Sequence, residues 1–180
     1  MERSFVERLA AATIGETFNQ YAGSRLRRDR LAAYLSERRG ARLLLVAEAP
    51  GYRGTRISGI PLTSERQLTG TGPAEATATI VHAVLEELGI DNDVLLWNVV
   101  PTHPGTESSN RPPTRTEIEA SAPFLAELSD CRRAIAIGRI AHARIGGPYV
   151  RHPSHGGAAA FRTGLAAASR STKLLSIALA

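Results

Sequence analysis

The sequence predicts an α/β protein in which strands of a parallel sheet alternate with helices. Short apolar runs, of the length and continuity typical of strands buried on both faces, recur along the chain. Segments with helical spacing or helix caps lie between these runs, which is the pattern of strand–helix units. With 180 residues and no repeat or linker composition, we expect one domain, whose residues 1–40 form a helical N-terminal segment.

Two helices are predicted before the first strand, over residues 4–13 and 24–39. Each begins with a serine that can cap it, and in the second helix apolar residues recur at helical spacing. The second helix also has an arginine-rich face, which is either a phosphate-binding patch or an ordinary solvated face. The arginines are Arg25, Arg27, Arg28, Arg30, Arg38 and Arg39.

The first predicted strand begins at Leu43 with five apolar residues and ends at Glu48, Ala49, Pro50 and Gly51. Open α/β sheets bind ligands beyond the carboxyl ends of their strands, so Glu48 is a candidate for chemistry. The alternative is that Glu48 only marks where the strand reaches solvent, or pairs with an arginine.

The remaining chain continues the alternation. After a long glycine-containing loop of the kind that is usually functional, we expect further strands at 94–100, 134–137 and 149–150. The intervening helices are expected at 73–88, from Thr114 with a Thr114/Glu117 capping box, at 138–145 and at 157–168. Residues 174–179 form either one more strand or a tail packed on the core.

Polar residues end three of these strands: Glu48, Asn98 and His152. Parallel strands end on the same side of a sheet, so a carboxylate, an amide and an imidazole are expected around one pocket. Two simpler interpretations stay open, in which Asn98 caps a loop and His152 is a satisfied histidine under the last helix.

Composition bears on the binding partner and on the cellular compartment. The net charge is +5 and Lys173 is the only lysine, so arginine carries the basic excess; this suits a phosphate-rich partner or reflects a GC-rich genome. One cysteine, Cys131, excludes a four-cysteine cluster, and we expect it to be a small core residue. No signal peptide or membrane span is recognisable, so we expect a cytoplasmic protein that does not bind membranes.

Three segments resemble the signature regions of the uracil-DNA glycosylase superfamily, in the same order and at similar spacing. They read VAEAPGYRGTRISGIPL, WNVVPTHPGTESSNRPPTRTE and VRHPSHGG. The likeness is strongest to the iron–sulfur bacterial and archaeal branch and covers most of a signature-bearing core, residues 41–170. It implies a three-layer α/β/α sandwich on a mainly four-stranded parallel sheet. Most members of that branch hold an iron–sulfur cluster with four cysteines, and this chain has one cysteine, so we expect no cluster, metal or cofactor. A sandwich of this size needs no partner to complete its core, so we expect a monomer without a protein partner.

The resemblance also implies DNA as the partner and hydrolysis of the N-glycosidic bond of a flipped-out uracil or other damaged or modified pyrimidine. His152 would stabilise the departing base and Glu48 the attacking water or the sugar cation. Base-binding residues would be Ala49, Pro50, Gly51, Tyr52, Leu62 and Asn98. Residues at a DNA phosphate would be Ser154, His155, Gly156, Gly157 and Arg111.

Departures from the family pattern leave the substrate open. The motif glycine is Ala47, the position of an aspartate or asparagine in other branches is Ala49, and Leu62 lies where the iron–sulfur branch stacks an aromatic ring on uracil. Tyr52 would have to replace that stack, or a roomier pocket would accept a bulky modified base.

Several alternatives therefore stand beside the glycosylase. One alternative is a catalytically silent DNA- or nucleotide-binding module. Another is a glycosylase that removes bulky modified bases from phage DNA in defence. A metal-dependent hydrolase would use His103, His152 and His155 with Glu48. A further variant of the glycosylase has His155 attack the sugar covalently.

Overall fold

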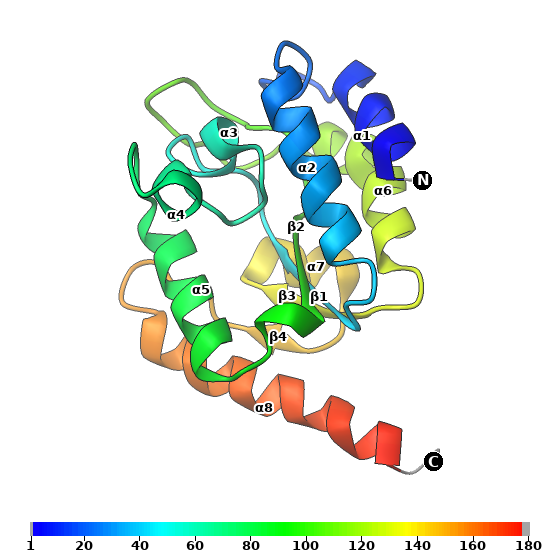
Figure 1. The fold of residues 1–180 in the computed structure, drawn as a ribbon, viewed down its shortest axis with the longest axis vertical. Coiled ribbons are helices and arrows are strands. Elements are labelled where there is room, and N and C mark those ends of the chain that lie inside the picture. Colours follow the sequence, from blue (N-terminus) through cyan, green and yellow to red (C-terminus); the bar gives the residue numbers. More distant parts are fainter. Residues whose placement is uncertain (1, 178–180) are drawn as a thin grey trace.

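A parallel sheet forms the centre of the protein (Figure 1). The computed structural model describes residues 2–177, with side chains described as far as Arg170. Four strands lie in the order β2-β1-β3-β4, all parallel. They are β1 (Leu43–Ala47), β2 (Val94–Asn98), β3 (Arg133–Ile137) and β4 (Tyr149–Val150). The α/β class and the four-stranded parallel sheet predicted from the sequence are confirmed.

Helices cover the sheet from two sides. One group, α1, α2 and α6, lies across the sheet from a second group, α5 and α8 (Figure 1). An ion pair between Glu87 of α5 and Arg162 of α8 joins these two helices. The helices are α1 (Glu2–Ala11), α2 (Arg25–Glu37), α3 (Thr55–Ser58), α4 (Glu65–Thr69), α5 (Ala76–Glu87), α6 (Arg115–Ser129), α7 (Arg139–Ile145) and α8 (Ala158–Ile177), with a 3-10 turn at Asp91–Asp93.

The N-terminal helices complete the core. Phe5 of α1 packs edge-on against Trp97 of β2 and Phe124 of α6, each at 5.7 Å between ring centroids. Tyr34 of α2 accepts a hydrogen bond at 2.7 Å from the backbone N–H of Leu96. That N–H lies on β2, an outer strand of the sheet, so the tyrosine hydroxyl satisfies a donor that no strand reaches.

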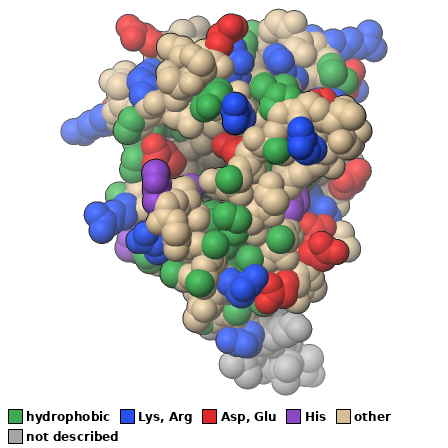
Figure 2. Space-filling model, turned by 90° about the vertical axis from the view of Figure 1, so that its left-hand side faces the viewer, with side chains coloured by type: hydrophobic (Ala, Val, Ile, Leu, Met, Phe, Trp, Pro, Cys, Tyr) green, Lys and Arg blue, Asp and Glu red, His purple; other side chains and the backbone are tan. Residues whose placement is uncertain are grey.

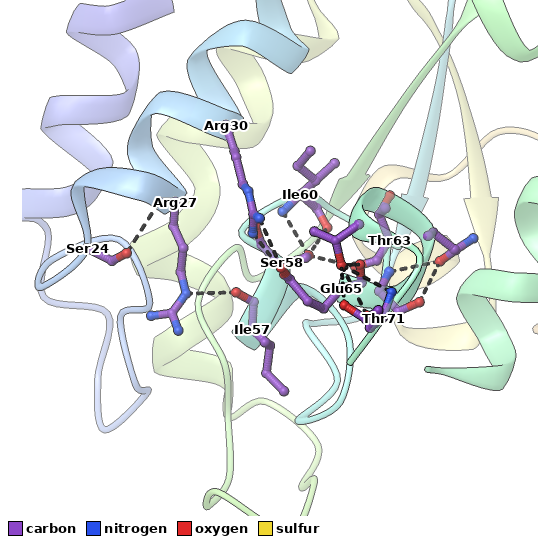
Figure 3. A network of polar contacts seen from close by, with 12 residues as sticks. Ser24, Arg27, Arg30, Ile57, Ser58, Ile60, Thr63, Glu65 and Thr71 are labelled. Atoms are coloured by element: carbon purple, nitrogen blue, oxygen red, sulfur yellow. Dashed lines mark hydrogen bonds and ion pairs between the residues drawn. The ribbon is translucent and has the colours of Figure 1, made fainter. Parts of the chain in front are cut away.

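Two of the α2 arginines, Arg27 and Arg30, hold the loop after β1, whereas Arg25 and Arg39 are largely exposed, as expected for a solvated face. Arg27 Nε donates to the carbonyl of Ile57 at 2.9 Å, and Arg30 donates to the carbonyl of Ser58 at 3.2 Å. Arg30 also makes a two-pronged pair with Glu65, at 2.8 and 2.9 Å (Figure 3). These guanidinium groups fasten α2 to residues 57–65 and do not form a free phosphate-binding patch.

The structure corrects three predictions of secondary structure. The helix expected at 73–88 begins at Ala76, with Glu75 at its N-cap position. The loop after β1 contains α3 and α4; Gln67 accepts the backbone N–H of Ser64 and so favours the start of α4. The strand alternative for residues 174–179 is wrong as far as Ile177, because α8 continues to that residue. Residues 178–179 lie outside the described part.

Cys131 is exposed, contrary to the expectation of a core residue. It lies between α6 and β3 with a φ of 61°, so the chain turns there in a left-handed conformation and directs the side chain to solvent. None of the helices in the described residues is sufficiently long and apolar to span a bilayer.

Candidate active site

Glu48, Asn98 and His152 line one pocket beyond the carboxyl ends of the strands. The cavity measures about 230 Å³, below the roughly 300–1,000 Å³ common for drug-sized ligands, so it is sized for a single small ring system. The structure thus brings together the three residues that sequence reasoning placed at one edge of the sheet. Other lining residues are Ala47, Ala49, Pro50, Gly51, Thr55, Leu62, Glu75, Thr77, Pro104, Asn110, Arg111, Ser154 and His155.

The backbone fixes Glu48 and Asn98 relative to each other. Ala47 lies opposite Asn98 in the parallel ladder of β1 and β2. Hydrogen bonds continue past the strand ends, from Val99 N–H to the Ala47 carbonyl at 2.8 Å and from Val100 N–H to the Glu48 carbonyl at 3.1 Å. The two loops that carry the carboxylate and the amide are therefore held side by side by main-chain bonds.

The Glu48 carboxylate has no hydrogen bond or ion pair with any described residue. The alternative in which Glu48 pairs with an arginine is therefore not supported. Burial in the pocket raises the pKa of Glu48 above its usual range, and no neighbouring cation offsets this effect. A half-buried carboxylate without a partner retains its full capacity to accept hydrogen bonds from a ligand or water.

Asn98 is 2% exposed, and its Oδ1 has no hydrogen-bond partner among the described residues. An unpaired buried amide oxygen costs about 1–3 kcal/mol, so this atom calls for a donor that enters the pocket. The interpretation of Asn98 as a loop cap is not supported, because its oxygen caps nothing in the described structure.

His152 is held by Ser154 through one ring nitrogen. The Ser154 backbone N–H donates to Nδ1 at 3.2 Å, and the Ser154 hydroxyl lies 2.8 Å from the same atom. Because Nδ1 accepts, a neutral imidazole carries its proton on Nε2. Burial lowers the pKa of His152, and the neighbouring His155 lowers it further, which favours this neutral form. Gly138 lies beside His152, where an added Cβ would make only an ordinary contact, so its φ of 87° and not a lack of space favours glycine there.

The turn after His152 places two backbone amides at the start of α8. His155 and Gly156 adopt successive left-handed conformations, with φ of 51° and 74°. Gly157 must lack a side chain, because a Cβ there would collide with the His152 carbonyl, and its N–H donates to Ser154 O at 3.0 Å. The amide of Gly157 and the Ser154 hydroxyl already have partners within the protein. Of the groups in this turn that were predicted to bind a phosphate, the backbone N–H groups of His155 and Gly156 therefore stay available.

Of three other predicted site residues, Leu62 and Arg111 line the pocket and Tyr52 does not. Tyr52 lies outside the pocket, with its ring under the guanidinium of Arg53 at 5.7 Å, so it cannot replace the missing aromatic stack. Leu62 does line the pocket, in a left-handed conformation with φ of 51°. Arg111 lines it too, but a two-pronged pair with Glu117 at 2.8 and 2.5 Å occupies its guanidinium.

His103 does not join the other histidines. Its ring is fully buried, with Nδ1 2.7 Å from the Pro50 carbonyl and Nε2 2.8 Å from the Thr106 carbonyl. The Nδ1 contact connects the loop after β2, which carries His103, with the loop after β1, and the Nε2 contact lies within the loop after β2. The described residues contain no group of three metal-ligating side chains, so the histidine-based metal site is not assembled.

Sequence reasoning missed several residues that line the pocket, and Asn110 and Glu75 are two of them. Asn110 belongs to the Asn-Arg-x-Pro signature and accepts the Tyr52 backbone N–H at 2.9 Å, so its motif was available as a signal. Glu75 carries no motif, and the prediction of a helix from Pro73 placed it inside that helix instead of before α5, where it lines the pocket.

The fold and these strand-end residues define an α/β protein with an acid, an amide and an imidazole around a base-sized pocket. A family model, described as the uracil DNA glycosylase superfamily, matches residues 35–173, and the chain belongs to this family. No curated protein matches the sequence.

The fold is similar to a crystal structure of wild-type SMUG2 from Pedobacter heparinus, with a TM-score of 0.67. The alignment covers 96% of this chain and 98% of that chain at 12% identity, so the likeness concerns the fold.

Proposed function

We propose that this chain is a DNA glycosylase that hydrolyses the N-glycosidic bond of a base flipped out of DNA, leaving an abasic site. The observation that carries the proposal is the convergence of Glu48, Asn98 and His152, each with a functional atom that no described residue satisfies. The target bond is inaccessible in stacked DNA, so the base must enter the pocket before reaction.

His152 would stabilise the departing base. As the glycosidic bond breaks, negative charge develops on the base and its carbonyl oxygen. The arrangement of Ser154 favours a neutral imidazole with Nε2–H free to donate to that oxygen. Such a preorganised donor in a buried site contributes a few kcal/mol to transition-state stabilisation.

Asn98 would recognise the base and Glu48 would serve the sugar side. The orphan Oδ1 of Asn98 suits a base N–H, which no carbon-bound hydrogen can replace. The unpaired carboxylate of Glu48 suits a water molecule or the positive charge that develops on deoxyribose. Together the residues divide the reaction between leaving-group stabilisation, base recognition and water positioning.

The DNA backbone would bind at the turn before α8. The N–H groups of His155 and Gly156 make no hydrogen bond within the described structure, and they lie where the helix dipole favours negative charge. Basic side chains are spread over the face that contains α4, α5 and this turn, with histidine and acidic side chains between them (Figure 2). The net charge of +5 assists a general attraction to DNA.

An incision assay tests the proposal. Labelled single- and double-stranded oligonucleotides carrying uracil, hypoxanthine, xanthine or a bulky modified cytosine are incubated with the protein and then cleaved with alkali at abasic sites. We expect incision of at least one substrate, reduced at least 100-fold by Glu48→Gln and by His152→Ala. Glu86→Gln, an exposed acid on α5, serves as the control. Binding to DNA without incision of any substrate would favour a silent binding module instead.

A further inference from the structure

Glu75 places a second carboxylate in the pocket. It is the residue before α5, at the N-cap position, yet its side chain makes no capping hydrogen bond. The side-chain oxygen of a residue that caps a helix accepts a backbone N–H of the first turn. The Glu75 carboxylate does not make this bond, and Glu75 is one of the residues that line the pocket.

Two glycines of the loop after β1 make room for this carboxylate. A Cβ added to Gly51 would collide with Oε1 of Glu75, and one added to Gly54 would collide with Oε2. Each carboxylate oxygen therefore rests against a different glycine. The spacing of Gly51 and Gly54 is thereby explained, because a side chain at either position would displace the carboxylate.

No described residue balances the Glu75 carboxylate. It has no hydrogen bond and no ion pair, and burial raises the pKa of Glu75 without an opposing cation. Glu48 and the Oδ1 of Asn98 line the same cavity in the same unpaired condition. The pocket thus presents more hydrogen-bond acceptors than its own donors can satisfy.

Building on the proposed function, we propose that Glu75 is a specificity-determining residue that accepts an N–H from an exocyclic amino group of the extruded base. An amino group offers two N–H donors on one nitrogen, one for Asn98 and one for Glu75. Uracil offers a single N–H between two carbonyl oxygens and would leave the Glu75 carboxylate facing an acceptor. The preferred substrate class is then an amino-bearing base, such as a modified cytosine.

A binding measurement tests this proposal without relying on turnover. Oligonucleotides carry 5-hydroxymethylcytosine or 5-hydroxymethyluracil, which differ in the amino group or carbonyl at C4 and in the proton at N3, on a 2′-fluoro-arabino sugar that resists cleavage. We expect the wild-type protein to bind the cytosine form at least 10-fold more tightly. Glu75→Ala should reduce that ratio to within about 2-fold, because the acceptor is lost.

The controls separate specificity from folding and from catalysis. Glu86→Gln should keep the wild-type ratio, and Glu75→Gln, which keeps one acceptor oxygen, should give an intermediate ratio. The proposal is overturned when wild-type protein shows no preference for the amino-bearing base, or when Glu75→Ala keeps the preference. Failure of the proposed function would appear separately, as no base release from any cleavable oligonucleotide in the incision assay.

Discussion

The Ser154 backbone N–H donates to Nδ1 of His152, and this bond determines which ring nitrogen can donate to a ligand. With Nδ1 occupied as an acceptor, the proton of the neutral ring is on Nε2. The hydroxyl of the same serine contacts Nδ1 at 2.8 Å, so one residue orients the ring through two groups.

Ser154→Ala should weaken catalysis less than loss of the imidazole itself. The variant loses the hydroxyl contact and keeps the backbone donor, so we expect kcat/KM for base release to fall about 2- to 13-fold, the equivalent of one hydrogen bond. His152→Ala should cost at least 100-fold. Single-turnover kinetics on the preferred substrate measure both, and equal losses in the two variants would show that the backbone bond does not orient the ring.

The pH dependence should follow the raised pKa of Glu48. The carboxylate is the active form, and burial shifts its pKa upward from the usual 4.5, so base release should increase as pH rises through that higher value. The pKa of His152 is lowered from 6.5, so the ring is already neutral near pH 7 and adds no rise above that pH. A kcat/KM profile checks this, and the acid limb should disappear in Glu48→Gln. An acid limb that persists in this variant would assign it to another group.

Glu65→Gln should loosen the loop that carries Leu62. Glu65 and Arg30 are each 20% exposed and form the two-pronged pair that ties α4 to α2 (Figure 3). We expect the free energy of unfolding in urea to fall by about 1–2 kcal/mol. Glu119→Gln removes a far more exposed partner from the Arg115–Glu119 pair and should cost less than about 0.5 kcal/mol. Equal changes in the two variants would contradict a structural role for the Arg30–Glu65 pair.

Acid should remove the stabilisation supplied by Glu117. The hydrogen bonds from Arg111 lower the pKa of this buried carboxyl to about 2, from 4.5. A carboxyl with a depressed pKa stabilises the fold fully above its unfolded-state pKa, so roughly 3 kcal/mol should be lost as pH falls from about 4.5 to about 2. Unfolding curves across this range should show a shallower loss for Glu117→Gln, and parallel pH dependences would contradict the assignment.

Leu62→Phe should add the aromatic stack that the pocket lacks. Leu62 lines the cavity and Tyr52 does not, and the sequence resemblance implies an aromatic ring at the position of Leu62. We expect base affinity to increase by about 1–3 kcal/mol in binding to an uncleavable oligonucleotide. Leu62→Met, a flexible side chain of similar size, is the control, and tighter binding in that variant as well would attribute the gain to volume rather than stacking.

Much of the fold and the centre of the pocket followed from sequence pattern. Continuous apolar runs located the strands, and parallel strand ends necessarily share an edge, so Glu48, Asn98 and His152 could be expected together. The Thr114/Glu117 capping box is present as predicted, because its partners are three residues apart.

The partners of long side chains could not be predicted in the same way. Whether Arg30 faces solvent or Glu65 depends on a contact between residues 35 positions apart, which no local period encodes. Glu75 was missed for a related reason: its position depends on Gly51 and Gly54, which belong to a different loop. Tertiary packing determines the side-chain positions of both Arg30 and Glu75.

The central claim is that the residues at the strand ends release a base from DNA. The most direct measurement is a single-turnover reaction in which free base is quantified by mass spectrometry alongside abasic sites, for wild-type protein, His152→Ala and Glu86→Gln. We expect equal amounts of free base and abasic sites with wild-type protein and Glu86→Gln, and at least a 100-fold slower release with His152→Ala. Base release that is unchanged in His152→Ala, or no release from any substrate by wild-type protein, would contradict the account.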